Sequence, residues 1–139
     1  MDITFNHCID KYIEIWRKSS LSELRELISE DYKAREITGG KIIDFGYAES
    51  IEGWEQGFNF VKENQAKWEL NKLSVIPLRD NEILIILSAA LVTKDQNLDT
   101  GNIFFQTFKK ECDENWKLVR SYIEAGIPLH NLRSPTVAE

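Results

Sequence analysis

Cysteine, histidine and basic charge are all scarce in this chain of 139 residues. It contains two cysteines and two histidines, and its formal net charge is −6. Cys8 and Cys112 have neither the density of a disulfide framework nor the spacing of a Cys-x-x-Cys metal site, so we expect buried free thiols. The distant His7 and His130 add no ligand cluster, and we therefore expect no metal and no cofactor.

The shortage of basic residues also limits the partners. A nucleic-acid surface needs clustered lysine and arginine to replace phosphate counterions, and this acidic chain has no such cluster, so we expect no nucleic-acid partner. No window approaches the roughly 20 apolar residues of a membrane span. The N-terminal segment carries charges where a signal peptide has a continuous apolar core. We expect a cytoplasmic protein with no membrane partner.

What the sequence does contain is a change of hydrophobic period near residue 66. Before that point, apolar residues three and four apart predict helices over about residues 2–18, from Leu21 onward and over 50–65. Ser20 and Glu23 have the spacing of a capping box at the start of the second helix, and Ser50 is a possible N-cap of the third. Between these two helices, the glycine pair at 39–40 predicts a β-hairpin turn.

After that point the period is two, which predicts four long antiparallel strands in a meander. The alternation shifts phase between Leu70 and Leu73, which is typical of a bulge that bends a strand. The predicted fold class is α+β, with N-terminal helices packed on a strongly curved antiparallel sheet. We expect a single domain over residues 1–127 and, because 128–139 shows no periodicity, a flexible tail.

The strand Ile83–Val92 is apolar on both of its faces. Helices on one side of an antiparallel sheet cover only one face, so the other face needs a different cover. We expect a homodimer through this outer sheet face, because a self-complementary partner would bury the exposed row. The alternative is a C-terminal segment that lies across the same face.

The last strand predicts either a pocket wall or a surface ladder. Regular alternation places Arg120, Tyr122 and Glu124 on the same face as Trp116 and Leu118. Apolar residues beside a few convergent polar groups are typical of a ligand pocket. In the alternative, Arg120 and Glu124 simply pair in water and contribute little free energy.

The order of these elements, with Asp31 and Tyr32 opening the first strand and WKLVRSYIE ending the meander, resembles the nuclear transport factor 2-like superfamily. The resemblance covers about Phe5 to Ile127 and is greatest to the bacterial SnoaL-like members. It implies a cone-shaped α+β barrel that encloses a pocket, commonly in a homodimer. The superfamily includes isomerases, dehydratases, polyketide cyclases and non-catalytic binding domains, so the fold alone does not define a function.

The resemblance also implies catalytic positions. Isomerases of this group use a tyrosine on the first helix and an acid on the next strand, which correspond here to Tyr12 and to Asp31 or Glu36. Their second oxyanion donor, an acid on a middle strand, has no counterpart in ILIILSAALV, which argues against ketosteroid isomerase activity.

Three functions are therefore consistent with the sequence. The first is small-molecule binding, with Arg120 as a contact for an organic anion. The expected lining residues are Tyr12, Trp16, Tyr32, Trp54, Trp68, Phe104, Arg120 and Tyr122. The second is a SnoaL-like lyase, isomerase or cyclase in which Asp31, Glu36 or Glu124 acts with a tyrosine in acid–base chemistry. The third is a dimeric interaction module whose cone is filled.

Overall fold

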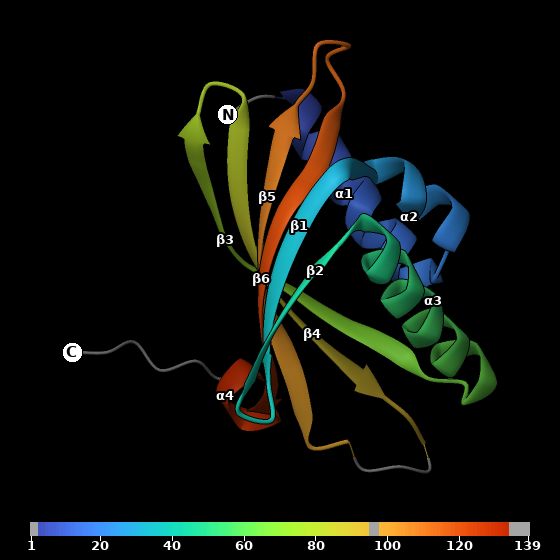
Figure 1. The fold of residues 1–139 in the computed structure, drawn as a ribbon. Coiled ribbons are helices and arrows are strands. Elements are labelled where there is room, and N and C mark those ends of the chain that lie inside the picture. The colour runs from blue at the N-terminus through green and yellow to red at the C-terminus, as the bar shows by residue number, and fades with distance from the viewer. Residues whose placement is uncertain (1–2, 95–97, 134–139) are drawn as a thin grey trace.

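The computed structural model describes residues 3–94 and 98–133, and it confirms the α+β class. In chain order the elements are α1 (Ile3–Lys18), α2 (Leu21–Leu27), β1 (Ile28–Thr38), β2 (Lys41–Gly46), α3 (Tyr47–Glu63), β3 (Lys67–Arg79), β4 (Glu82–Val92), β5 (Thr100–Lys110), β6 (Trp116–Pro128) and α4 (Leu129–Arg133) (Figure 1). No helix within these residues is long and apolar enough to cross a membrane.

The strands form one open, mixed sheet in the order β2-β1-β6-β5-β4-β3. Strands β3 to β6 make the predicted antiparallel meander, and β1 with β2 makes the predicted hairpin. In one respect the sheet differs from the prediction, because β1 runs parallel to β6. The chain from β2 to β5 connects β1 to β6, and a parallel strand pair requires a long connection of this kind.

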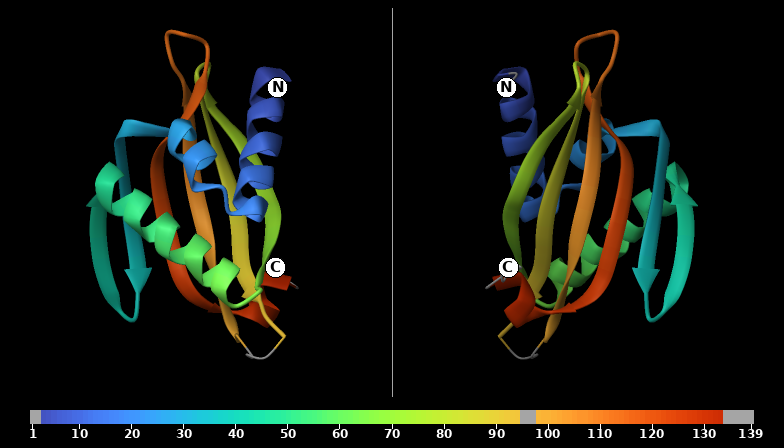
Figure 2. Two further views of the ribbon diagram at one scale, coloured as in Figure 1. Left: turned by 90° about the vertical axis from the view of Figure 1, so that its right-hand side faces the viewer. Right: turned by 90° about the vertical axis from the view of Figure 1, so that its left-hand side faces the viewer.

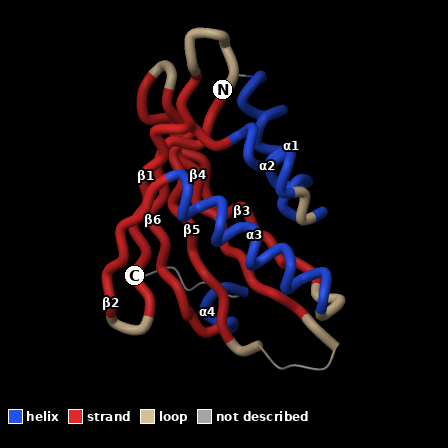
Figure 3. Tube along the Cα trace, turned by 45° about the vertical axis from the view of Figure 1, so that its right-hand side comes forward, coloured by secondary structure: helices blue, strands red, loops and turns tan. Residues whose placement is uncertain are grey.

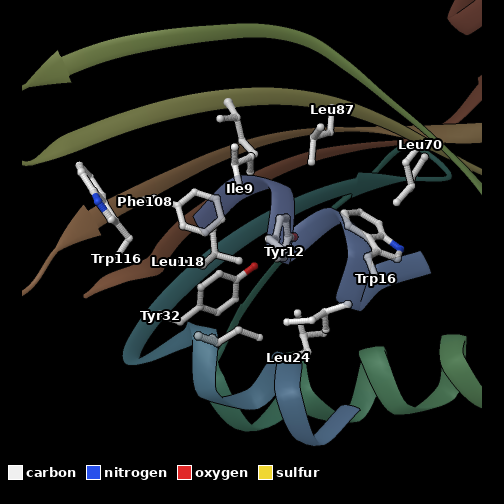
Figure 4. Packing of buried hydrophobic residues seen from close by; sticks show 14 of the residues in the cluster. Ile9, Tyr12, Trp16, Leu24, Tyr32, Leu70, Leu87, Phe108, Trp116 and Leu118 are labelled. Carbon is white, nitrogen blue, oxygen red and sulfur yellow. The ribbon is translucent and has the colours of Figure 1, made fainter. Parts of the chain in front are cut away.

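Helices α1, α2 and α3 lie on one face of the sheet, which we call the inner face (Figures 2 and 3). The apolar stripe of α1 is buried against it, and Phe5, Ile9, Tyr12 and Trp16 are each at most 1% exposed. Figure 4 shows this packing against β4, β5 and β6. Burial of such side chains contributes about 1.5–3 kcal/mol each, so the stripe fixes where α1 lies.

Several register shifts interrupt the strand pairing, and two of them bear on the sequence-based predictions. In β3 the pairing shifts between Lys72 and Ser74, which confirms the predicted phase slip and leaves Leu73 42% exposed. In β6 a second shift occurs where Phe108 pairs with Leu118 and the preceding Thr107 pairs with Arg120. The regular alternation of the last strand did not indicate this second bulge, which reverses the faces of residues 120–124. A further shift follows before Ile127, which pairs with Gly101.

The sequence predicts the hairpin turn correctly but not the N-termini of α2 and α3. Gly39 and Gly40 have φ angles of +55° and +77°, as the predicted tight turn requires. The Ser20 hydroxyl bonds the Glu23 carboxylate at 3.1 Å instead of a backbone N–H, so the capping box does not form. Helix α3 begins at Tyr47 with Gly46 as its N-cap, four residues before the N-cap that Ser50 indicated.

The face opposite the helices, which we call the outer face, is covered at one end by α4. The buried Leu132 side chain packs there so closely that a Cβ on Gly101 would lie 2.7 Å from it and 2.7 Å from the Ala89 carbonyl oxygen. Arg133 also bonds Glu69 of β3, with Nε 2.9 Å from Oε2. The predicted tail therefore begins with a helix, and residues 134–139 lie outside the described part of the chain.

The two cysteines differ from each other. Cys8 is half-buried on α1, and desolvation raises the pKa of its thiol to about 11. Cys112 is exposed in the turn before β6, so the prediction of a buried thiol is wrong for this residue. Charged turn residues surround it in the sequence, and these keep the segment in solvent.

Candidate functional site

A cavity of about 500 Å³ lies on the inner face between α3, the β1–β2 hairpin and the meander. Its volume falls within the usual range of small-molecule sites. The wall is largely aromatic and contains Trp16, Tyr32, Phe45, Trp54, Trp68 and Phe104. The cone is therefore not filled by its own side chains.

Trp16 holds the aromatic wall together. Its ring packs edge to face on Trp54, Phe104 and Trp68, with centroids 4.7, 5.1 and 5.8 Å away. The Trp68 indole donates a hydrogen bond to the Ser19 hydroxyl at 3.0 Å, which fixes the orientation of that ring. Interlocked aromatic pairs of this kind contribute beyond their buried area, so the wall is preformed. The buried Trp16 N–H itself has no hydrogen-bond acceptor among the described residues.

Glu36 brings a carboxylate to this wall. The register places it on the inner face of β1 beside Ile43 of β2 and Ile123 of β6, and Ile123 is paired in turn with Phe104 of β5. The side chain is half-buried, and desolvation by these apolar neighbours raises its pKa. Within the described residues, Glu36 forms no hydrogen bond or ion pair.

The other two carboxylates that line the cavity are already engaged. Glu49, in the first turn of α3, accepts a hydrogen bond from the Gly46 N–H at 3.1 Å. Asp44 is held by Arg35, whose Nε lies 2.7 Å from its Oδ1, and this pairing lowers the Asp44 pKa. Among the described residues that line the cavity there is no lysine, arginine or histidine.

A chain of buried polar groups runs between the cavity and the core. The Tyr12 hydroxyl donates to Gln106 Oε1 at 2.8 Å, and Gln106 Nε2 lies 3.4 Å from the Ser121 hydroxyl. Tyr32, which lines the cavity, is hydrogen-bonded through its own hydroxyl to Ser121 and Ser50. Burial raises the pKa of Tyr12 well above its usual value and also raises that of Tyr32, so both phenols remain protonated.

The structure brings together Trp16, Tyr32, Trp54, Trp68 and Phe104 among the predicted lining residues. Tyr12 does not line the cavity and lies among the buried core residues (Figure 4). Its hydroxyl donates a hydrogen bond to Gln106. Sequence reasoning missed Gln106, Ser121 and the buried position of Ser50. One feature of the sequence could have indicated Gln106. It is a single polar residue at an inward-facing position of β5, between Phe104 and Phe108.

Arg120, Tyr122 and Glu124 lie on the outer face, so the prediction that they share a face with Trp116 and Leu118 is wrong. The bulge in β6 shifts the alternation by one residue and turns Ser121 and Ile123 inward instead. Arg120 forms an exposed ion pair with Glu82 at 3.5 Å, and the Tyr122 hydroxyl donates to Glu124 at 2.6 Å. Arg120 therefore does not pair with Glu124 as the surface-ladder alternative expected. Arg120 and Tyr122 instead line a second hollow, of about 1110 Å³, together with Asp31 and Tyr32.

The structure places the three candidate acids in different environments. Asp31 is exposed near the start of β1 and Glu124 lies on the outer face, whereas Glu36 lines the cavity. No group of three or more histidine, cysteine, aspartate or glutamate side chains within residues 3–94 and 98–133 is arranged to hold a metal ion. Acid–base chemistry in the cavity therefore depends on Glu36.

No protein-family model and no curated protein matches this sequence. Solved structures match its fold over most of the chain. A cystatin-like domain of unknown function from Nostoc punctiforme is 15% identical, with a TM-score of 0.68 over 96% of this chain and 84% of that one. An NTF2-like protein of unknown function from Silicibacter pomeroyi is 9% identical, with a TM-score of 0.65 over 88% and 92%.

A third similar structure is an NTF2-like protein of unknown function in nutrient uptake from Rhodospirillum rubrum. It is 17% identical, with a TM-score of 0.63 over 90% of this chain and 98% of that one. Identities this low support a shared fold and do not transfer an activity. The helix layer, the open curved sheet and these matches together show that the chain has the nuclear transport factor 2-like, cystatin-like fold.

Proposed function

We propose that this protein binds a small organic molecule in the inner-face cavity. The observation that carries the proposal is a preformed, aromatic-walled space of about 500 Å³ with one unpaired carboxylate in its wall. Apolar walls with a few polar groups are typical of ligand sites.

Two glycines of α3 support the proposal. Gly53 and Gly57 are four residues apart on the cavity side of the helix, and both line the cavity. A Cβ on Gly53 would meet nothing within 4 Å, and one on Gly57 would only touch the Trp68 ring at 3.8 Å. Glycine within a helix costs about 1 kcal/mol relative to alanine. The helix therefore accepts a loss of stability at the two positions where side chains would narrow the cavity.

The experiment fills the cavity with a larger side chain introduced on α3. Gly53→Phe places a ring in space that the structure leaves open, whereas Gly53→Ala gives the same helix-stabilising methyl group without filling the space. Indole is the probe, and its binding is measured by ligand-observed NMR and titration. We expect indole to bind the wild type and Gly53→Ala, and Gly53→Phe to weaken that binding at least about tenfold, roughly 1.4 kcal/mol.

Equal binding of indole by all three proteins would show that the probe sits elsewhere and would contradict the proposal. Thermal unfolding of the two variants provides the control for folding. Both are expected to melt at or above the wild-type temperature, because each replaces a helical glycine.

A SnoaL-like lyase, isomerase or cyclase is the second candidate function, and the state of Glu36 favours it. A carboxylate whose pKa is raised by desolvation is a suitable general base near neutral pH. Tyr32, whose phenol remains protonated, lines the same cavity and is the candidate proton donor. Turnover of a ketone that Glu36→Gln abolishes while its binding persists would distinguish catalysis from binding alone.

A further inference from the structure

The charges and rings of the cavity indicate the chemical class of its occupant. We infer that it takes an organic cation, namely a protonated or quaternary amine on an apolar body. The cationic head lies beside Glu36, and the body lies against the tryptophan and phenylalanine rings. This inference rests on the proposed binding function and specifies its ligand class.

The charge argument begins with Glu36. Its carboxylate is half-buried, and no described residue pairs with it. A desolvated charge is costly until a counter-charge compensates it. Glu49 carries the same sign at the same cavity, Asp44 is already neutralised by Arg35, and the described lining contains no basic side chain. An anion would find no counter-charge in the lining, and a neutral molecule would leave Glu36 uncompensated.

The aromatic wall provides a second, independent reason. Cations are attracted to the faces of aromatic rings, and tryptophan is the strongest partner. Trp54, Trp68 and Phe104 all line the cavity and are only half-buried, so part of each ring is open to a ligand. The Trp54 and Phe104 rings are near parallel, at 19°, with centroids 6.4 Å apart. Sites that bind amines typically combine aromatic rings with a carboxylate, and this cavity has both.

The sheet register sets the size of the ligand. Glu36 and Phe104 lie in one row across the inner face, separated by the β6 residue Ile123. Adjacent strands are about 4.8 Å apart, so the two backbones are roughly 10 Å apart. A phenylalkyl amine therefore has the length to place its ammonium group beside Glu36 and its aromatic ring against Phe104.

The experiment compares three probes of nearly equal size on the full chain at pH 7.5: 2-phenylethylammonium, 2-phenylethanol and phenylacetate. Affinities are measured by NMR titration, following the indole N–H signals of Trp54 and Trp68. We expect the cation to bind at least about tenfold more tightly than the alcohol, and phenylacetate to bind most weakly.

The variant Glu36→Gln removes the charge and keeps the shape. It should weaken binding of the cation about tenfold and leave the alcohol unchanged. Glu52→Gln is the matched control, because Glu52 is an exposed residue of α3 that does not line the cavity and its loss changes the net charge equally. This control should bind all three probes as the wild type does.

The outcomes separate the two claims. If 2-phenylethanol binds as tightly as the cation, or if Glu36→Gln weakens both equally, the cavity is a binding site but the cation inference is overturned. If none of the probes binds and indole binding is insensitive to Gly53→Phe, both the inference and the proposed function fail. Backbone amide spectra of the variants verify that the fold is retained.

Discussion

Glu36 is held in a partly desolvated environment that favours its protonated form. Its folded-state pKa is raised, so between the unfolded and folded pKa values the native protein binds more protons than the unfolded chain. The free energy of unfolding therefore falls as the pH rises through this window. At low pH the residue is protonated in both states and the penalty disappears.

We expect Glu36→Gln to raise the melting temperature at pH 8 and to have a smaller effect at pH 4. Because the side chain is only half-buried, the gain at pH 8 should be small, about 1–3 °C. Thermal unfolding followed by circular dichroism at both pH values, with Glu52→Gln as the control, measures the difference. A shift of the same size at pH 4 and pH 8 would show that desolvation of the charge is not its cause.

At this scale the sequence predicts apolar positions better than polar ones. Trp16, Trp54 and Trp68 follow helix or strand spacing, and any core on that side of the sheet brings them together. Arg120 was assigned to the wrong face because one extra residue in β6 reverses the alternation. Nothing in KLVRSY marks that position, since a bulge depends on the register of the neighbouring strand.

Helix α4 shows how a short element acts through a few contacts. Its anchor is Leu132, which is 5% exposed and packs over Gly101 on the outer face. The ion pair of Arg133 with Glu69 is half-exposed and contributes little by comparison. The helix is too short to persist alone, so its position depends on the leucine.

We therefore expect Leu132→Ala to lower the free energy of unfolding by about 2–3 kcal/mol, as measured by urea denaturation. His130→Ala is the matched control, because His130 is exposed on the same helix, and it should change the stability by less than about 0.5 kcal/mol. If both variants behave alike, α4 is not docked through Leu132 in solution.

The long elements were predictable from periodicity, and the pairing of β1 was not. Seventeen residues of α3 and eleven or more in each strand of the meander repeat their pattern often enough to identify the element. Helix α4 has five residues and completes little more than one turn, so it has no detectable period. The parallel pairing of β1 with β6 depends on the packing of the whole sheet, which no local pattern encodes.

At the scale of the whole molecule, the described residues leave part of the outer face without cover. Leu84, Ile86 and Phe105 form a half-buried apolar row there, flanked by Ile76 at 40% and Tyr122 at 39% exposure. Helix α4 covers only the end of this face near Gly101. The expected reason for a sheet face of this composition is association with a second copy.

We expect the chain to be a homodimer at micromolar concentration through this face, with Ile86→Lys shifting it to monomer. Size-exclusion chromatography with light scattering gives the mass. Leu73→Lys is the control, because Leu73 is also an accessible apolar residue, more exposed than Ile86, but lies in the bulge of the edge strand β3. A wild-type monomer, or an Ile86→Lys variant that still dimerises, would contradict the assignment of the interface.

The distribution of tryptophan has a practical consequence. Three of the four, Trp16, Trp54 and Trp68, surround the cavity. Trp116 lies elsewhere in the core, with its ring 5.1 Å from Phe5 and its indole bonded to Thr4. An occupant of the cavity would change the emission of Trp16 and of the two indoles that pack on it, and would leave the fourth as an internal standard. The protein thus contains its own fluorescent reporter for identifying the molecule it binds.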